Sequence, residues 1–227
     1  LDSGQHGELI SGLASGDRIY SYALSEPGGG SDLLSLRTQA KFDGKSFHIN
    51  GSKLWISLAQ ESDLIFVLAR TDEPEPGRSQ ASGLSLLIVP TDQPGVQVNK
   101  VNMAIMRAAG TCEIFFTDAY APADSIVGER GRGLQALRGT LDVERVLSAA
   151  ISLGIGHGAL DLALRYVGER EAFGGPIGRF QAVQHPLAES ASELTAASLL
   201  VEHAARNLDE GKPASQESAM AKLVASE

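Results

Sequence analysis

The spacing of apolar positions changes part-way along the chain. From about residue 18 to residue 122, short apolar runs such as IYSYAL, KLWISLA, DLIFVLAR and GLSLLIVP alternate with turn residues. This spacing predicts a compact antiparallel β sandwich or barrel. Asp43-Gly44 lies between two alternating segments and predicts a β-hairpin. The polar, proline-rich stretch 71–83 predicts a mobile hairpin loop.

After residue 130 the apolar period becomes helical. No proline interrupts the pattern from Leu134 to about Arg170, and further helical patterns run over residues 181–210 and from about Ser215. Gly154 and Gly158 lie four positions apart, which predicts a helix face that another helix approaches closely.

The predicted fold class is therefore α+β and multidomain. We expect the tail of an N-terminal helical domain in residues 1–17 and an antiparallel β sandwich or barrel in residues 18–130. Part of an antiparallel four-helix bundle is expected in residues 131–227. The chain opens without methionine and closes on a helical pattern without a stop signal, so we expect a fragment of a longer protein.

Composition narrows the classes of function. The chain has 227 residues and a formal net charge of −9, with no run of five basic residues, which argues against nucleic acid or an anionic membrane as the main partner. A single cysteine, Cys112, excludes an internal disulfide framework and a cysteine-built metal site, and the histidines show no metal spacing. No uninterrupted apolar stretch approaches ~18 residues, so we expect a soluble protein.

Two segments of the β region carry candidate chemistry. YALSEPGGGSD, residues 22–32, predicts a strand that enters a glycine loop; it is either an ordinary turn or a place where backbone N–H groups approach a flat or anionic ligand. No Lys-Ser/Thr pair follows the glycines, so a P-loop is disfavoured. In NGSKLWIS, residues 50–57, Trp55 is either a core residue or, beside Ser57, a wall for an aromatic cofactor.

Two segments of the helical region are also candidates. REAFGGPIGRFQ, residues 170–181, is a helix-to-helix corner in which Arg170 and Gln181 would suit a phosphate or a carbonyl. In GTLDVERVLSAA, residues 139–150, Glu144 shares an apolar helical stripe with Leu141, Leu147 and Ile151. Such a carboxylate bends out to water, is neutralised by a partner, or acts as a base.

Four segments follow one another along the chain: YALSEPGGGSD, NGSKLWIS, MRAAGTCEIFFTDAYAPADSIVGERGRG and REAFGGPIGRFQ. In this order, they resemble segments of the acyl-CoA dehydrogenase family of flavoproteins. The resemblance covers essentially the whole chain. It implies an N-terminal helical domain, a central β domain and a C-terminal four-helix domain, assembled as a homotetramer that binds FAD.

The resemblance also implies which residues form the cofactor site. Positions around the flavin are Tyr22, Leu24, Ser25, Gly30 and Ser31, and positions on its other wall are Trp55 and Ser57. Arg170, Phe173 and Gln181 match residues that reach the FAD of a neighbouring subunit. Ser25 and Ser57 replace threonines of the family pattern and keep the hydroxyl, and the family's Gly-Gly segment for the FAD pyrophosphate falls beyond Glu227.

The implied reaction is FAD-dependent α,β-dehydrogenation of an acyl-CoA thioester to the 2-enoyl-CoA. A carboxylate removes the α proton and the β hydrogen leaves as hydride to the flavin. Glu144, in LDVER, matches the base of one subgroup, and a glutamate beyond Glu227 is the alternative. Ser31, Asp142 and Arg145 match substrate-binding positions, although Asp142 and Arg145 would equally form a helix ion pair.

Other functions stay open on the same residues. A flavin-dependent monooxygenase or oxidase uses the same scaffold with O₂ as acceptor, and a non-catalytic acyl-CoA or acyl-carrier binding module would contain no flavin. For the dehydrogenase, we expect acyl-CoA as substrate and an electron-transfer flavoprotein as acceptor. The expected location is the bacterial cytoplasm or the mitochondrial matrix.

Overall fold

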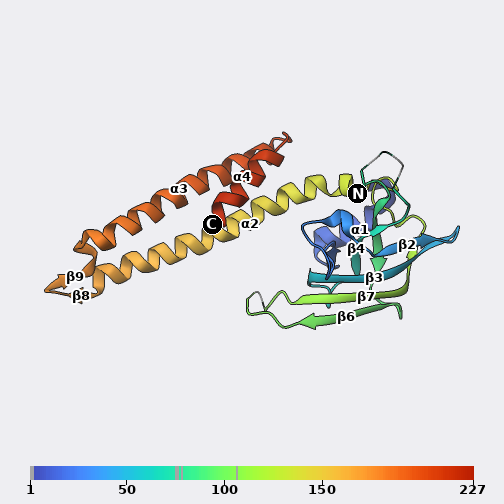
Figure 1. The fold of residues 1–227 in the computed structure, drawn as a ribbon, viewed down its shortest axis with the longest axis horizontal. Helices are drawn as coiled ribbons and strands as arrows, with labels where there is room; N and C mark the ends of the chain where they lie inside the picture. The colour runs from blue at the N-terminus through green and yellow to red at the C-terminus, as the bar shows by residue number, and fades with distance from the viewer. Residues whose placement is uncertain (1–2, 75–76, 78, 106) are drawn as a thin grey trace. The chain divides into compact units, whose positions relative to one another are not determined.

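A computed structural model describes residues 3–74, 77, 79–105 and 107–227. The chain divides into two compact units, Leu1–Leu137 and Arg138–Glu227. The first unit, here called the β unit, holds all the strands of the main sheet, and the second, the helical unit, holds most of the long helix and the helices that follow it (Figure 1).

The β unit follows the predicted succession of short apolar runs. Its elements are α1 (Ser3–Ser15), β1 (Tyr20–Ala23), η1 (Leu33–Ser35), β2 (Gln39–Phe42), β3 (Ser46–Ser57), β4 (Leu64–Arg70), β5 (Leu84–Pro90), β6 (Val96–Val101), β7 (Thr111–Pro122) and the start of α2 (Gly133–Glu169). Residues 75, 76 and 78 of the predicted mobile loop 71–83 lie outside the described residues.

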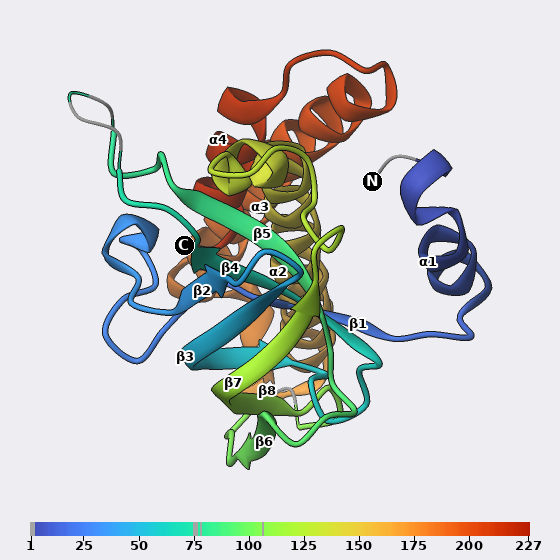
Figure 2. The same ribbon diagram turned by 90° about the vertical axis from the view of Figure 1, so that its right-hand side faces the viewer.

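The described strands form one twisted seven-stranded sheet in the order β1-β4-β2-β3-β7-β6, with β5 paired to β4 (Figure 2). The predicted class, a β domain followed by helices, is confirmed. The pairing differs in one respect, because β4 runs parallel to β1 and to β2. The pairs β4–β5, β2–β3, β3–β7 and β6–β7 are antiparallel. Parallel neighbours need a long crossover rather than a tight turn, which apolar spacing does not reveal.

Two strands differ from the sequence prediction. The predicted run KLWISLA is largely the second half of a longer strand, β3, which begins at Ser46. The pairing of β3 with β7 shifts register between Ile49 and Gly51 and again between Leu54 and Ile56. Strand β6 was not predicted, because its half-exposed VQVNKV pattern is the weak signal of an edge strand.

The core of the β unit lies where the central strands are covered on both faces. All residues of β4 and β5 except the last of each are buried, in keeping with continuous rather than alternating apolar runs. The cluster includes Phe47, Ile49, Ile65, Val67, Leu87, Val89 and Ile114. Gly133 begins α2 against β5, where an added Cβ would come within 2.6 Å of the Leu86 backbone nitrogen.

The helical unit continues α2 and adds β8 (Glu171–Ala172), β9 (Gly175–Pro176), η2 (Ile177–Arg179), α3 (Gln181–Asp209) and α4 (Ser215–Ala225). Figure 1 shows α2 and α3 side by side, joined by the short β8–β9 hairpin, with α4 folding back along them. Small and branched residues of the three helices form its core: Val146, Ala149, Leu153, Ala197, Val201, Ala204 and Ala221.

Within this chain, the close helix contact of α2 lies at Gly156 rather than at Gly154 and Gly158. A Cβ added at either glycine meets nothing within 4 Å, whereas a Cβ at Gly156 would come within 2.6 Å of a Leu194 methyl group. The face of α2 that meets α3 therefore passes through Gly156.

Much of α2 is apolar and exposed in this chain. Its exposed large hydrophobic residues are Val143, Leu147, Ile151, Ile155, Leu162, Leu164 and Tyr166. An 18-residue window of α2 has a mean hydropathy of 1.4, so by length and composition alone this helix would be able to cross a membrane. The core helix of a soluble protein passes the same test, so these two properties do not assign α2 to a membrane.

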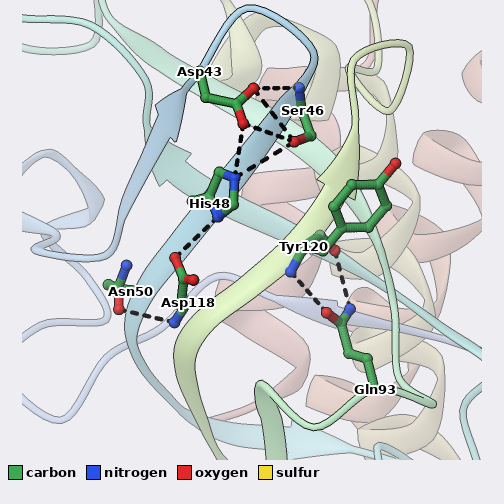
Figure 3. Close-up of polar contacts among 7 residues, drawn as sticks. All are labelled: Asp43, Ser46, His48, Asn50, Gln93, Asp118 and Tyr120. Atoms are coloured by element: carbon green, nitrogen blue, oxygen red, sulfur yellow. Dashed lines mark hydrogen bonds and ion pairs between the residues drawn. The ribbon is translucent and has the colours of Figure 1, made fainter.

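The β2–β3 hairpin forms at the predicted Asp43-Gly44 turn. The Asp43 carboxylate accepts from the backbone N–H groups of Lys45 (2.8 Å) and Ser46 (2.9 Å), and Gly44 has a left-handed φ of 101°. On the adjoining strand, the His48 imidazole lies between two carboxylates, with Nε2 3.1 Å from Asp43 and Nδ1 3.0 Å from Asp118 (Figure 3). The turn and β7 are thereby linked through one imidazole.

We predict that this link depends on pH. Hydrogen bonds to Asp43 and then Asp118 raise the pKa of His48 above its ordinary value of 6.5. A raised pKa in the folded state contributes stability that is fully present below pH 6.5 and is lost as pH rises through the folded pKa. The difference in unfolding free energy between wild type and His48→Asn should therefore shrink as the pH rises across this window.

An NMR titration of the His48 ring provides the direct measurement. Asp118→Asn should lower the pKa of His48 by replacing a charged carboxylate with a neutral amide, and asparagine tolerates the left-handed backbone (φ 53°) of this position. A His48 pKa at or below 6.5 in wild type would contradict the assignment.

Candidate functional site

The two candidate segments of the β unit lie side by side. The Ser21 hydroxyl donates to the carbonyl of Ser57 at 2.8 Å, and the Leu54 N–H donates to the carbonyl of Ser25 at 3.0 Å. These bonds align the end of β1 and the loop that follows it with the second half of β3. The predicted site residues Tyr22, Leu24, Ser25, Trp55 and Ser57 therefore come from two adjacent segments.

Trp55 is held at the surface rather than in the core. It lies between Leu54 and Ile56, where the register of β3 with β7 shifts, and it has a left-handed φ of 68°. This backbone is uncommon for a bulky residue and costs free energy. The side chain nevertheless remains 55% exposed, so burial within this chain does not compensate the strain. An exposed indole beside the Ser57 hydroxyl suits a flat aromatic ligand.

A buried ion pair fixes the loop after β1. The Lys53 ammonium group is fully buried and lies 3.0 Å from the carbonyl of Leu24 and 3.1 Å from the Glu26 carboxylate. The other hydrogen bonds of Glu26 come from the backbone N–H groups of Arg37 (2.7 Å) and Thr38 (2.9 Å). One carboxylate therefore ties the loop to β3 and to the approach to β2.

The pair is charged at neutral pH. Burial lowers the pKa of Lys53 to about 8, against the opposing charge and hydrogen bond of Glu26. Burial also works to raise the pKa of Glu26, but hydrogen bonds from Thr38 and Arg37 and the charge of Lys53 outweigh it, so this pKa lies below its ordinary value. Neither residue was assigned a role from the sequence. The available signal was an acidic residue, Glu26, in YALSEPGGGSD and a basic residue, Lys53, in NGSKLWIS.

The glycine loop has one position where space is tight. Glu26 and Gly29 exchange backbone hydrogen bonds of 2.8 and 3.1 Å, and a Cβ on Gly29 would approach the Ser35 hydroxyl to 3.0 Å. Gly30 has ordinary space toward Ser25, and Ser31 is exposed. The loop ends at Asp32, whose carboxylate caps the 3₁₀ turn η1 by accepting from the Leu34 N–H at 3.1 Å.

The candidates of the helical corner also lie together. Arg170 accepts a backbone hydrogen bond from Ile177 (2.8 Å), which closes the β8–β9 hairpin at its base, and Gln181 begins α3. Phe173, at the hairpin tip, has a left-handed φ of 52° and is 90% exposed. Among the described residues, the side chains of Arg170 and Gln181 make no hydrogen bond or ion pair, so their polar groups are available to a ligand.

Asp142 has a structural role that the sequence indicated only in part. Its carboxylate accepts from Arg145 at 2.6 Å, which is the alternative helix pair, and from the Ser215 hydroxyl at 2.5 Å and the Ser218 hydroxyl at 3.3 Å. Asp142 is buried, and its bonds to the two serines join α2 to the start of α4. Glu144 takes no part in these contacts. It is exposed in this chain, as are Leu147 and Ile151 on the same helical stripe.

The structure thus gathers the candidates into separate groups. The β unit holds one group, formed by Tyr22 to Ser31 with Trp55 and Ser57. The helical unit holds two groups: one is Arg170, Phe173 and Gln181, and the other is Asp142 with Arg145. Within the part of the chain that is described, no three His, Cys, Asp or Glu side chains come together in a way that would hold a metal ion.

Comparison with known proteins agrees with this arrangement. Residues 21–119 match the acyl-CoA dehydrogenase middle domain and residues 131–227 match the acyl-CoA dehydrogenase C-terminal domain. The mitochondrial short-chain specific acyl-CoA dehydrogenase of Bos taurus is 40% identical over 224 residues, which cover 98% of this chain and 53% of the bovine protein. The chain spans about half the length of the curated relatives it matches.

Two solved structures illustrate the range of similar folds. Butyryl-CoA dehydrogenase from Megasphaera elsdenii is similar with a TM-score of 0.92 at 31% identity, covering 99% of this chain and 58% of that one. The prolyl acyl carrier protein oxidase AnaB is similar with a TM-score of 0.91 at 29% identity, again covering 99% and 58%. Both similarities extend over the β unit and the helices that follow it, because each covers 99% of this chain. The chain belongs to the acyl-CoA dehydrogenase family.

The buried ion pair gives a prediction about stability. Lys53→Met leaves Glu26 buried without a counter-charge and should lower the unfolding free energy by about 3–5 kcal/mol. The double variant Lys53→Met/Glu26→Gln should lose less, because no unpaired charge remains. Urea unfolding measures both, and Lys41→Met on exposed β2 is the matched control. Equal losses in the single and double variants would contradict this account.

Proposed function

We propose that the whole protein is an FAD-dependent dehydrogenase that converts an acyl-CoA thioester to the 2-enoyl-CoA. The observation that carries the proposal is the Trp55 indole, held exposed in a strained backbone beside Ser57 and the anchored glycine loop. Membership in the acyl-CoA dehydrogenase family supports the choice of reaction.

The residues present fit a flat, partly anionic cofactor. In the β unit, Trp55 and Tyr22 offer aromatic surface, Ser25 and Ser57 offer hydroxyls, and the remaining contacts come from Leu24, Gly30 and Ser31. In the helical unit, Arg170, Gln181 and the exposed ring of Phe173 would bind the FAD of a neighbouring subunit of a homotetramer. When bound, FAD supplies the acceptor for the hydride that leaves the β carbon.

The chain's own part in the chemistry is proton removal and substrate alignment. The α carbon of a thioester is a weak acid, so its proton needs a carboxylate base whose pKa is raised by burial. We assign this role to Glu144, which is exposed in this chain. The assignment therefore requires that bound acyl-CoA or another part of the whole protein covers Glu144. The competing base is a carboxylate outside these 227 residues.

Ser31 and Arg145 are proposed to contact the substrate. Ser31 is exposed at the end of the glycine loop, and Arg145 keeps donors beyond the one that binds Asp142. The Asp142 carboxylate is already occupied by Arg145, Ser215 and Ser218. Its contribution to substrate binding is therefore to orient Arg145.

The base assignment is tested in the full-length protein with Glu144→Gln. We expect this variant to retain FAD and to bind acyl-CoA, because the amide is nearly isosteric. Its rate of anaerobic flavin bleaching by acyl-CoA should fall by roughly 10²–10⁴, the usual contribution of a general base. Glu202→Gln, an exposed glutamate on α3, is the control. Unchanged bleaching would exclude Glu144 and favour the carboxylate outside this chain.

An oxidase is the second candidate, because AnaB, named a prolyl acyl carrier protein oxidase, has a similar fold at 29% identity. Rapid mixing of the substrate-reduced protein with O₂ separates the two. A dehydrogenase should reoxidise slowly with O₂ and quickly with an electron-transfer flavoprotein, whereas an oxidase should reoxidise quickly with O₂. A colourless full-length protein that cannot be reconstituted with FAD would instead indicate a non-catalytic acyl-CoA or acyl-carrier binding module.

A further inference from the structure

The tip of the β8–β9 hairpin carries an aromatic side chain in a costly conformation. Phe173 has a φ of 52°, and a bulky side chain is strained in this left-handed region. Strain of this kind persists only where surrounding contacts determine the backbone. Yet Phe173 is 90% exposed, and the ring of Phe180 meets it edge-on with centroids 6.0 Å apart. Packing of the Phe173 ring does not account for the conformation.

Arg179 supplies the missing contacts. Its guanidinium donates to the carbonyl of Phe173 and, at 3.4 Å, to the carbonyl of Gly174. The same group lies over the Phe180 ring, 5.1 Å from its centroid. Arg179 thus holds both peptide units of the tip while it stacks on the ring that contacts Phe173. A planar guanidinium is suited to make both kinds of contact at once.

The rest of the hairpin forms a fixed base for this contact. Ala172 pairs with Gly175, and a Cβ at Gly175 would approach the Arg179 guanidinium to 2.9 Å, so glycine leaves room for it. On the α3 side, the Gln184 amide donates to the carbonyl of Gly178 at 2.9 Å. Backbone pairing therefore fixes the base of the hairpin, and Arg179 fixes its tip.

We propose that Arg179 is a positioning residue that presents Phe173 to the FAD of a second copy of this chain. The inference rests on the proposed function, in which Phe173 contacts that cofactor. Arg179 itself acts through Phe173. Because the tip is ordered before the cofactor arrives, binding does not have to order it, and affinity is higher than for a mobile tip.

The test uses the full-length protein, stripped of FAD and titrated with FAD while flavin fluorescence is followed. Arg179→Ala should raise the FAD dissociation constant roughly three- to tenfold, the range expected when one side chain must be immobilised on binding. Arg179→Lys should recover part of the loss, since it keeps a donor without the planar stack. Arg165→Ala is the control, because Arg165 is exposed on α2 and donates to the carbonyl of Asp161 in its own helix.

A double-mutant cycle separates positioning from a general effect on folding. In a Phe173→Ala background, Arg179→Ala should cause no further loss of FAD affinity, because the residue it positions is gone. Additive losses, or wild-type affinity in Arg179→Ala, would overturn the proposal while leaving the proposed function intact. If Arg179→Ala does not fold, Arg179→Lys is measured in the same cycle. Failure of the wild-type protein to bind FAD would overturn the proposed function and, with it, this inference.

Discussion

The candidate site of the β unit depends on the ion pair between Glu26 and Lys53. The two residues come from the two motifs that supply most of the candidate cofactor contacts, and their charges cancel inside the protein. Because Lys53 also reaches the Leu24 carbonyl, and Glu26 also accepts from Arg37 and Thr38, the glycine loop is attached to β3 and to the chain leading into β2. A buried pair of this kind specifies where the loop lies more than it adds to stability.

Each unit also exposes one aromatic residue in a left-handed backbone, Trp55 in the β unit and Phe173 in the helical unit. Hydrogen bonds from Arg179 hold the backbone at Phe173, a register shift between β3 and β7 accompanies the conformation of Trp55, and burial of the ring accounts for neither. Burial of the ring does not offset the strain at either position, and the proposed function gives both residues a role, which is contact with the cofactor. This gives the two aromatic residues one physical interpretation although they lie in separate units.

Periodicity predicted the elements whose pattern is continuous. The helices over 133–169 and 181–209, the hairpin at Asp43-Gly44 and the succession of a β domain and helices are confirmed. Strand β6 was missed because an edge strand alternates weakly, and the helix contact was placed at Gly154 and Gly158 because spacing does not say which small residue faces a neighbour. The partners of Asp142 could not be predicted, since Ser215 and Ser218 lie more than seventy positions away. The assigned roles of the site residues stay predictions.

Asp142 and Arg145 have a consequence for how this helix can change over time. Asp142 carries the side-chain hydrogen bonds between α2 and α4, and Arg145 bonds to Asp142, while the side chain at position 144, between them, makes no hydrogen bond or ion pair within the described residues. The described polar contacts between α2 and α4 therefore do not involve residue 144. A substitution at position 144 leaves the hydrogen bonds of Asp142 with Arg145, Ser215 and Ser218 in place, so a reactive group at this position and the polar contacts that join the two helices are separate features of the sequence.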